Sequence, residues 1–296
     1  MTGRAAVKLG VVGAGSIGAR HAHMIAATAG CDLAAVIDPN SAARAAFDAP
    51  GYDTIDDVDV ALDGVIIATP TELHGPNGEA AAARGWHMLI EKPVTNTIAE
   101  ADRLIAALKA ANVTALVGHH RRHHASLQPL RALIADGAIG QPVLANMIWA
   151  VRKPDGYFDA AWRSGSGGSP VMINLVHDID ILRFVLGEIT GVTAVGGQPV
   201  RGEGRIESGV AVLSFANGCT ASCSFADTTP SPWGFEAGTS ENPAIAHTGE
   251  DMLRIMGTKG AVSFPSLTVW SGADDWSEVP NIRSERTVET TALAAQ

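Results

Sequence analysis

The sequence is poor in cysteine and has no long apolar run. Only Cys31, Cys219 and Cys223 stand among 296 residues, too few and too scattered for a disulfide framework or a cysteine-based metal cluster. No stretch reaches the roughly 18 consecutive apolar residues that a membrane-spanning helix needs. We therefore expect core roles for Cys219 and Cys223, a reducing cytoplasmic environment, and no membrane partner.

Positive charge is also scarce. Lysine and arginine number 21 against 31 acidic residues, which gives a net charge of −10. The densest basic stretch, 119–124, is too short to neutralise a run of backbone phosphates, so nucleic acid is not expected as a partner. There is no internal repeat, and the chain enters an apolar, strand-like run at Val7, which predicts no signal peptide.

What the chain does contain is a glycine fingerprint, Gly13-Ala14-Gly15-Ser16-Ile17-Gly18. It lies between a short apolar run at 7–12 and a helix-compatible run at 19–29. In this context the first glycine permits a tight turn, the second lets the backbone approach a pyrophosphate, and the third lets helix and strand pack closely. The helix N-terminus would then offer unpaired N–H groups to the phosphates. This arrangement predicts a dinucleotide site, and the alternative is a glycine-rich turn with no ligand.

Asp38 ends the next apolar run, 33–37, twenty residues after Gly18. A carboxylate there accepts hydrogen bonds from both ribose hydroxyls and repels a 2′-phosphate. The sequence therefore favours NAD as the cofactor over NADP. The alternative is an aspartate that only ends a strand.

Strands and helices alternate up to residue 122. We expect strands at 64–70, 87–90 and 114–118, and helices at 77–84 and at 98–111, the latter capped by Thr97. This alternation predicts an α/β fold with a parallel, doubly wound sheet, whose ligands lie beyond the carboxyl ends of the strands. The side chains expected at that rim are Thr69, Pro70, His74, Lys92 and those of 119–122.

The pattern changes after residue 122. Helices are expected at 127–136 and 171–186, and a strand at 142–151. Five further strands follow without intervening helices, at 191–196, 209–216, 219–226, 252–257 and 261–264. Their spacing predicts an antiparallel sheet. We therefore expect one domain at 1–122 and a second at 123–296.

Lys92 is the first candidate for chemistry. It stands in Glu91-Lys92-Pro93, directly after the strand at 87–90. Oxidation of a hydroxyl needs a base for its proton and a donor for the oxygen as it becomes a carbonyl, and Lys92 is placed to donate. Burial beside a cofactor would favour the neutral amine and let it relay protons. The alternative is a lysine paired with Glu91 at a solvated strand end.

His177 is the second candidate. At helical spacing Asn174, His177 and Asp180 lie on adjoining parts of one side, and Asp178 points elsewhere. Imidazole titrates near neutrality, so His177 can act as the base. The alternative is a core histidine satisfied by Asp180 or by a backbone carbonyl. Arg163, which follows Trp162, would either hold substrate oxygens or brace its loop.

From about residue 7 to residue 264 the order of short motifs resembles the glucose–fructose oxidoreductase and inositol dehydrogenase (Gfo/Idh/MocA) family. The motifs are Gly13 to Gly18, Ala68-Thr69-Pro70 with His74, Glu91-Lys92-Pro93, Gly118 with Arg122, Trp162-Arg163 before Gly167-Gly168, His177-Asp178-Ile179-Asp180 and Gly257-Thr258-Lys259-Gly260. The resemblance implies a Rossmann domain followed by an α/β domain with an open, mostly antiparallel sheet. That sheet commonly forms the oligomer interface in relatives, so a homo-oligomer, dimer or tetramer, is expected.

The resemblance also implies NAD(P)-dependent hydride transfer between nicotinamide and a hydroxyl or carbonyl carbon of a sugar, cyclic polyol or related molecule. It implies a cis peptide bond between Lys92 and Pro93. Lys92 and His177 are then the catalytic residues. The substrate-binding residues would be Asn174, Arg163, Trp162, Arg122 and Asp180, and Thr69, Pro70, His74, Glu91 and Lys92 would join the glycine fingerprint and Asp38 around the cofactor.

Two departures from the family pattern bear on function. Many relatives carry an acidic residue four positions before the histidine, where this chain has Ile173. The amide of Asn174 can orient a group but cannot stabilise an imidazolium as a carboxylate does. We therefore expect Lys92 to contribute more to catalysis than His177. The second departure is that 287–296 resembles only the approach to a helix that packs back on the first domain in relatives.

Two rival functions therefore stay open. One is a reductase of a ketone or unsaturated small molecule, and the other is a catalytically inactive, nucleotide-sensing protein. The histidines at 119, 120, 123 and 124 are expected to be too mobile to act as ligands, and no metal is expected.

Overall fold

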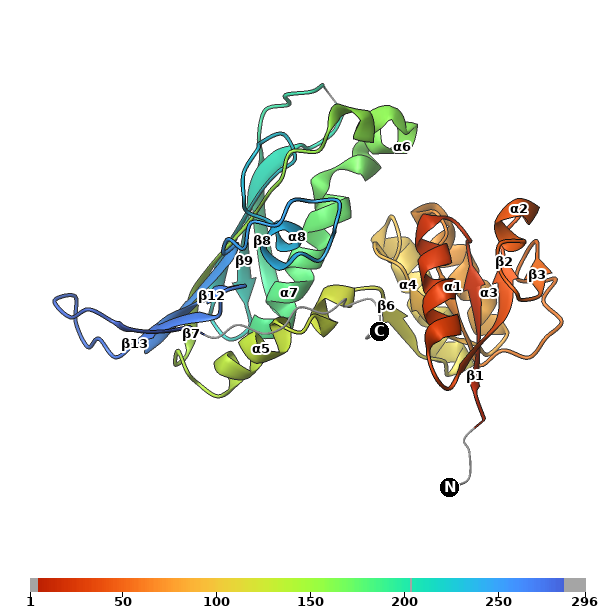
Figure 1. Ribbon diagram of the computed structural model, residues 1–296, viewed down its shortest axis with the longest axis horizontal. Helices are drawn as coiled ribbons and strands as arrows, with labels where there is room; N and C mark the ends of the chain where they lie inside the picture. Colours follow the sequence, from red (N-terminus) through yellow and green to blue (C-terminus); the bar gives the residue numbers. More distant parts are fainter. Residues whose placement is uncertain (1–4, 203, 285–296) are drawn as a thin grey trace. The chain divides into compact units, whose positions relative to one another are not determined.

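The computed structural model describes residues 5–202 and 204–284, and the chain divides into two compact units between His119 and His120. In Figure 1 the first unit runs from red to yellow and the second from yellow-green to blue. The division falls close to the boundary expected after residue 122.

The first unit is a parallel sheet of six strands in the order β3-β2-β1-β4-β5-β6. Its strands are β1 (Val7–Val12), β2 (Cys31–Ile37), β3 (Gly51–Tyr52), β4 (Gly64–Ile67), β5 (His87–Ile90) and β6 (Ala115–Val117). Its helices are α1 (Ser16–Ala27), α2 (Ser41–Arg44), the 3₁₀ turn η1 (Thr71–Leu73), α3 (His74–Ala83) and α4 (Ile98–Ala111). The expected doubly wound parallel sheet is thus confirmed.

Two hydrophobic clusters lie on the two faces of this sheet. Successive side chains of a strand point to opposite faces. Val11 accordingly packs with Ala22 and Ile25 of α1, and Val12 belongs to the cluster that contains Leu104 of α4. The N-terminus of α4 is fixed by a capping box in which Thr97 and Glu100 exchange hydrogen bonds, as the sequence predicted for Thr97.

The second unit is an eight-stranded sheet in the order β14-β13-β12-β11-β7-β10-β9-β8, antiparallel except where β7 and β10 pair. Its strands are β7 (Pro142–Ala150), β8 (Ile189–Gly196), β9 (Ser208–Phe215), β10 (Thr220–Ala226), β11 (Leu253–Gly257), β12 (Gly260–Phe264), β13 (Thr268–Ser271) and β14 (Asn281–Ser284). Its helices are η2 (His120–His123), α5 (Leu127–Ala135), η3 (Asp155–Asp159), α6 (Ala161–Ser164), η4 (Ser166–Gly168), the π-helix η5 (Val171–Leu175), α7 (Val176–Leu186) and α8 (Phe235–Thr239).

One face of this sheet is covered and the other is open. Leu130 of α5 and Leu182 of α7 share a fully buried core with the inward side chains of β7, β9, β10 and β11. The alternate side chains of β9, Val210 and Val212, are exposed on the other face. Cys219 and Cys223 are buried in the core and form no disulfide, as expected. The open, mostly antiparallel sheet is therefore confirmed.

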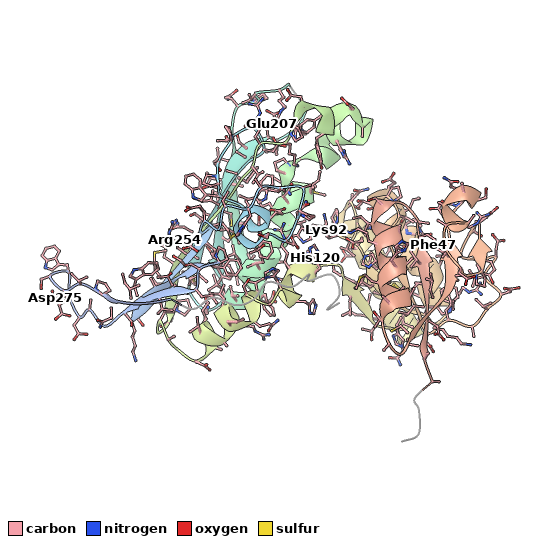
Figure 2. The ribbon with its side chains drawn as sticks, viewed as in Figure 1. Phe47, Lys92, His120, Glu207, Arg254 and Asp275 are labelled. Carbon is pink, nitrogen blue, oxygen red and sulfur yellow. The ribbon has the colours of Figure 1, made fainter. Side chains whose placement is uncertain are left out.

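Three features of the second unit were not predicted. The β13–β14 hairpin, with Asp275 near its tip, extends the sheet beyond the last expected strand (Figure 2). Helix α8 is only five residues long. The helix expected at 171–186 begins as a π-helix, which turns the residues before α7 relative to the α-helical spacing. The expected helix approach at 287–296 lies outside the described residues.

No helix within residues 5–202 and 204–284 combines the length and the apolar character that crossing a bilayer would require.

Candidate active site

The glycine fingerprint has the geometry that a dinucleotide needs. Gly13 has φ +90°, and a Cβ there would lie 2.8 Å from the backbone of Ala68. A Cβ on Gly18 would lie 1.7 Å from the carbonyl oxygen of Gly13. At Gly15, where α1 begins, a Cβ would meet no atom of the described residues within 4 Å. Gly13 and Gly18 are therefore required for close packing, and Gly15 leaves open space in front of the helix N-terminus, which suits a diphosphate.

Asp38 is fixed at the edge of this fingerprint. One carboxylate oxygen accepts from the N–H of Ala14 at 2.7 Å, and the other accepts from the N–H of Asn40 at 2.8 Å. A carboxylate offers about four acceptor positions, so capacity remains for ribose hydroxyls. The nearby cation Arg44 donates to the carbonyl of Asp38 and pairs with Asp53. The residues present therefore fit NAD.

Glu91 contacts His21, a histidine that the sequence did not mark as a site residue. His21 of α1 lies with its Nε2 2.9 Å from Oε1 of Glu91, and the N–H of Lys92 donates to Oε2 at 3.2 Å. Burial opposes ionisation, but His21 and Lys92 outweigh it and hold the pKa of Glu91 below its ordinary value. The peptide bond between Lys92 and Pro93 is cis, as expected. Glu91 therefore connects the fingerprint helix to the residue that carries the candidate chemistry.

His74 joins two strand ends at the same rim. Its ring is 2% exposed, with Nε2 2.9 Å from the carbonyl oxygen of Thr69 and Nδ1 2.9 Å from that of Pro93. Thr69 and Pro70 follow β4 and lead into η1. Both ring nitrogens of His74 thus face main-chain oxygens, which ties the segment after β4 to the segment that follows Lys92.

We expect the His21→Leu variant to lower the free energy of unfolding by about 3 kcal/mol, because the largely buried Glu91 carboxylate then loses its contact with the imidazole. Replacing both residues, His21→Leu with Glu91→Leu, removes the charge and should recover most of that loss. Urea denaturation of the three proteins measures this. A double variant as unstable as the single one would show that the carboxylate is not the cause.

In the second unit, a buried cluster surrounds Arg121. Its guanidinium donates to Asp178 at 2.9 Å and to Glu236 at 2.5 Å, and its Nε lies 3.5 Å from Glu241. Trp149 donates to the second oxygen of Glu236 at 3.0 Å. The sequence placed Arg121 only within the stretch 119–122 at the rim, and no motif marks Glu236 or Glu241.

This cluster corrects one expectation about the helix that carries His177. Asp178 was expected to point away from Asn174, but both reach the same cluster, Asn174 by donating to Glu236 at 3.4 Å and Asp178 by accepting from Arg121. The two residues are four apart, and side chains at i and i+4 are neighbours on a helix, so ordinary helical spacing already brings them together. Asp180 instead accepts a forked pair of hydrogen bonds from Arg122, at 2.7 and 2.5 Å.

Two of the four histidines at 119–124, His120 and His124, make specific side-chain contacts. His177 is buried on α7, and its ring centroid lies 5.0 Å from that of His120 in an edge-to-face arrangement. His120 pairs with Glu241. His124 is 1% exposed and bonds to Ser126 at 2.7 Å, so its predicted mobility is wrong. Among the residues that the structure describes, no group of three or more His, Cys, Asp or Glu side chains is arranged to hold a metal ion.

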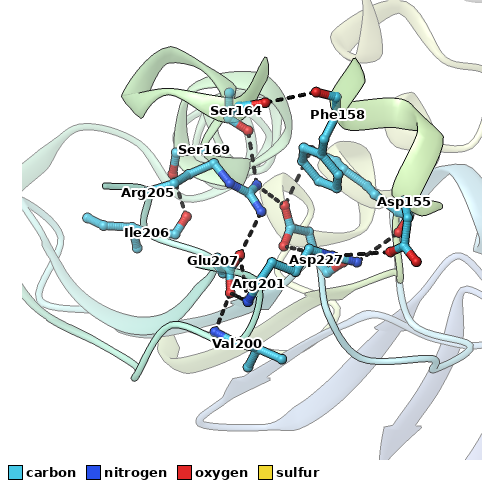
Figure 3. A network of polar contacts seen from close by, with 12 residues as sticks. Asp155, Phe158, Ser164, Ser169, Val200, Arg201, Arg205, Ile206, Glu207 and Asp227 are labelled. Atoms are coloured by element: carbon cyan, nitrogen blue, oxygen red, sulfur yellow. Dashed lines mark hydrogen bonds and ion pairs between the residues drawn. The ribbon is translucent and has the colours of Figure 1, made fainter. Parts of the chain in front are cut away.

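Arg163 braces its own loop. Its guanidinium donates to the carbonyl of Tyr157 at 3.1 Å and lies 4.3 Å from the centre of that ring. The side chain of Trp162 lies outside the described residues. Figure 3 shows the polar contacts beside this loop, in which Arg205 pairs with the buried Asp227 and with Glu207. Ser164 donates to the carbonyl of Phe158 at 2.8 Å.

Asp178 makes stability depend on pH. Burial raises the pKa of Asp178 to about 7; Arg121 opposes the rise, and Glu236 and Glu241 add to it. The folded protein therefore keeps a proton that the unfolded chain, with an ordinary value of 3.8, releases. Because the folded state binds more protons in this window, the free energy of unfolding falls as pH rises from about 4 to about 7.

We expect the Asp178→Asn variant to lose most of this dependence and to be more stable than the wild type at pH 8. An amide oxygen still accepts from Arg121, and no carboxyl remains to ionise. Urea denaturation at pH 5, 6.5 and 8 tests this, with the exposed Asp136→Asn as the matched control. Parallel pH profiles for Asp178→Asn and the wild type would contradict the assignment.

Comparison with known proteins follows the division into two units. A model described as an oxidoreductase family with an NAD-binding Rossmann fold matches residues 7–119, and a model of the GFO/IDH/MocA C-terminal domain matches residues 127–263. The chain is 33% identical over 190 residues to a 1,5-anhydro-D-fructose reductase from Ensifer adhaerens, an alignment that covers 62% of this chain and 56% of the reductase. Less than two thirds of that relative is therefore spanned.

Two further similarities extend over a larger part of the chain. An inositol 2-dehydrogenase from Rhizobium meliloti is 32% identical over 272 residues, which cover 87% of this chain and 75% of that protein. A solved oxidoreductase from Agrobacterium radiobacter, in complex with NAD⁺, L-tartaric acid and magnesium, has a TM-score of 0.80 at 18% identity, over 96% of this chain and 80% of that one. The solved structure indicates a shared fold.

Proposed function

Because the chain belongs to the GFO/IDH/MocA family of NAD-binding oxidoreductases, we propose that it is an NAD-dependent dehydrogenase acting on a CH–OH group of a sugar, cyclic polyol or related small molecule. The observation that carries the proposal is the setting of Lys92. It follows β5 in the unit that holds the glycine fingerprint and Asp38, and Glu91 and His74 fix the backbone on both sides of it.

The roles of the residues follow from the chemistry of the reaction. Bound NAD supplies the hydride acceptor. His177 takes the hydroxyl proton, and Lys92 donates a hydrogen bond to the oxygen as it becomes a carbonyl. The backbone N–H groups at the start of α1 hold the diphosphate, and Asp38 holds the ribose. Arg122 and Asp180 form a pair that presents both a donor and an acceptor to substrate hydroxyls, with Asn174, Trp162 and Arg163 as further contacts.

The names of the relatives support this substrate class. One is an inositol dehydrogenase and another is a reductase of a sugar-derived ketone. The second name keeps the reverse reaction, reduction of a ketone, as the alternative. The second alternative is a nucleotide-sensing protein without turnover, because Ile173 stands in place of the usual carboxylate.

A panel assay separates the three functions. Purified protein is mixed with NAD and inositol isomers or free sugars, and in parallel with NADH and 1,5-anhydro-D-fructose, while absorbance at the wavelength of NADH is followed. A dehydrogenase forms NADH with at least one polyol or sugar, and a reductase consumes NADH with the ketone. Binding of NAD without turnover in either direction would favour the sensing protein.

We further propose a homo-oligomer, dimer or tetramer, that forms through the open face of the eight-stranded sheet. Val195 of β8 is 73% exposed, and its partner Val210 and the neighbouring Val212 of β9 are exposed on the same face. Val212→Arg would place a charge in such an interface, so it should reduce the mass measured by light scattering to that of the monomer. An unchanged mass would contradict this interface. The cytoplasmic location expected from the cysteines stays a prediction, which cell fractionation tests.

A further inference from the structure

The sequence around His177 departs from the pattern that its proposed role calls for. Position 173, four residues before it, is isoleucine, and the amide of Asn174 is directed to Glu236. The ring of His120 contacts that of His177, at a centroid distance of 5.0 Å and an interplanar angle of 73°. The edge of one imidazole thus meets the face of the other, which restricts the orientation of both.

His120 is in turn oriented by Glu241. Its Nε2 is bonded to Oε1 of Glu241, and because a carboxylate only accepts, that nitrogen carries a hydrogen. Burial opposes ionisation of Glu241, but the hydrogen bond from His120 and the charge of Arg121 outweigh it and lower its pKa to about 2. Glu241 is therefore a carboxylate at neutral pH.

The charges around these two rings sum to an excess of negative charge. Arg121 carries one positive charge and contacts three acidic side chains, Asp178, Glu236 and Glu241. Even with a proton on Asp178, one negative charge remains uncompensated.

The other titratable neighbours do not change that balance. Arg122 and Asp180 neutralise each other, and His124 is bonded to Ser126. An excess of negative charge near an imidazole favours its protonated form. The net charge of the groups around His177 and His120 is therefore negative, as a carboxylate at position 173 would also be.

We infer that Glu241, acting through His120, is the acidic support of His177 in this chain and stands in for the carboxylate that position 173 lacks. His120 and Glu241 are positioning residues: they fix the plane of the His177 ring and stabilise the imidazolium that forms when His177 takes a hydroxyl proton. The inference rests on the proposed role of His177 as the base.

The test uses the protonation of His177 itself, which needs no substrate. The full chain, saturated with NAD and labelled with ¹³C-histidine, is titrated by NMR, and the His177 signal is identified by its loss in His177→Gln. We expect Glu241→Gln and His120→Phe each to lower the midpoint of His177 by about half a pH unit or more. The control Glu188→Gln removes an equal charge from an exposed ion pair of the same unit and should leave the midpoint unchanged.

A rescue distinguishes this support from a general role in folding. Ile173→Asp, added to Glu241→Gln, should return the midpoint to the wild-type value or above. A midpoint that stays unchanged in both Glu241→Gln and His120→Phe would overturn the inference, even if thermal stability fell. The titration and the panel assay are independent. The midpoint of His177 can stay unchanged in the variants although the protein turns over substrate, and it can shift as expected although no turnover is found.

Discussion

Lys92→Ala should lower kcat by roughly 100-fold or more and leave the affinity for NAD nearly unchanged. The ammonium is the donor proposed for the oxygen that gains negative charge, whereas the proposed NAD site is formed mainly by the fingerprint and Asp38. The measurement is kcat/KM across pH with the best substrate of the panel, together with a fluorescence titration of NAD. Lys109→Ala, an exposed lysine of the same unit, is the matched control. Near-normal kcat in Lys92→Ala would remove the central residue of the proposed reaction.

His177→Ala should also lower kcat by roughly 100-fold without changing NAD affinity, but Lys92→Ala should be the more damaging of the two. Support that reaches His177 through a second imidazole is weaker than a direct carboxylate bond, so His177 contributes less than in a chain with an acid at position 173. If His177→Ala alone abolished turnover, the ranking would be wrong and the site would stand.

NAD should bind at least tenfold more tightly than NADP. Asp38 would lose a charge-assisted hydrogen bond to the ribose and repel the added phosphate, and tenfold corresponds to only about 1.4 kcal/mol. Arg44, the nearby cation, is already engaged by Asp53 and by the carbonyl of Asp38.

Removal of the Asp38 carboxylate tests the same claim. Asp38→Ala should weaken NAD binding and narrow the difference in affinity between the two cofactors. Asp32→Ala, which removes an exposed aspartate from the strand β2 that Asp38 follows, should do neither. Fluorescence titrations with both cofactors measure this. Equal affinities in the wild-type protein, or tighter binding of NADP, would contradict the role of Asp38.

The sheets could be predicted because strand burial is recorded locally in the sequence. Short apolar runs such as 7–12 and 87–90 are long enough for one buried strand each, and Thr97 with Glu100 marks a helix start. The two-residue β3 and the four-residue α2 carry too little pattern to be recognised. The π-helix at 171–175 could not be predicted, since its residues suit an α-helix equally well.

The cofactor site was more predictable than the acid–base site. The fingerprint and Asp38 act through local backbone geometry, which glycine spacing records. The partners of the candidate acids and bases are distant in the chain: His21 and Glu91 are 70 residues apart, and Arg121 and Glu236 are 115 apart. No spacing rule connects such pairs, so the structure was needed to find them.

The central claim is that this chain transfers hydride between a carbinol carbon and bound NAD. The most direct measurement is deuterium transfer: the protein is incubated with NAD and inositols or sugars deuterated at their carbinol carbons, and the nicotinamide is analysed by mass spectrometry. We expect deuterium in the NADH formed by the wild-type protein and at least about 100-fold less transfer in Lys92→Ala. Saturating binding of NAD with no deuterium in the nicotinamide from any member of the panel would contradict the claim.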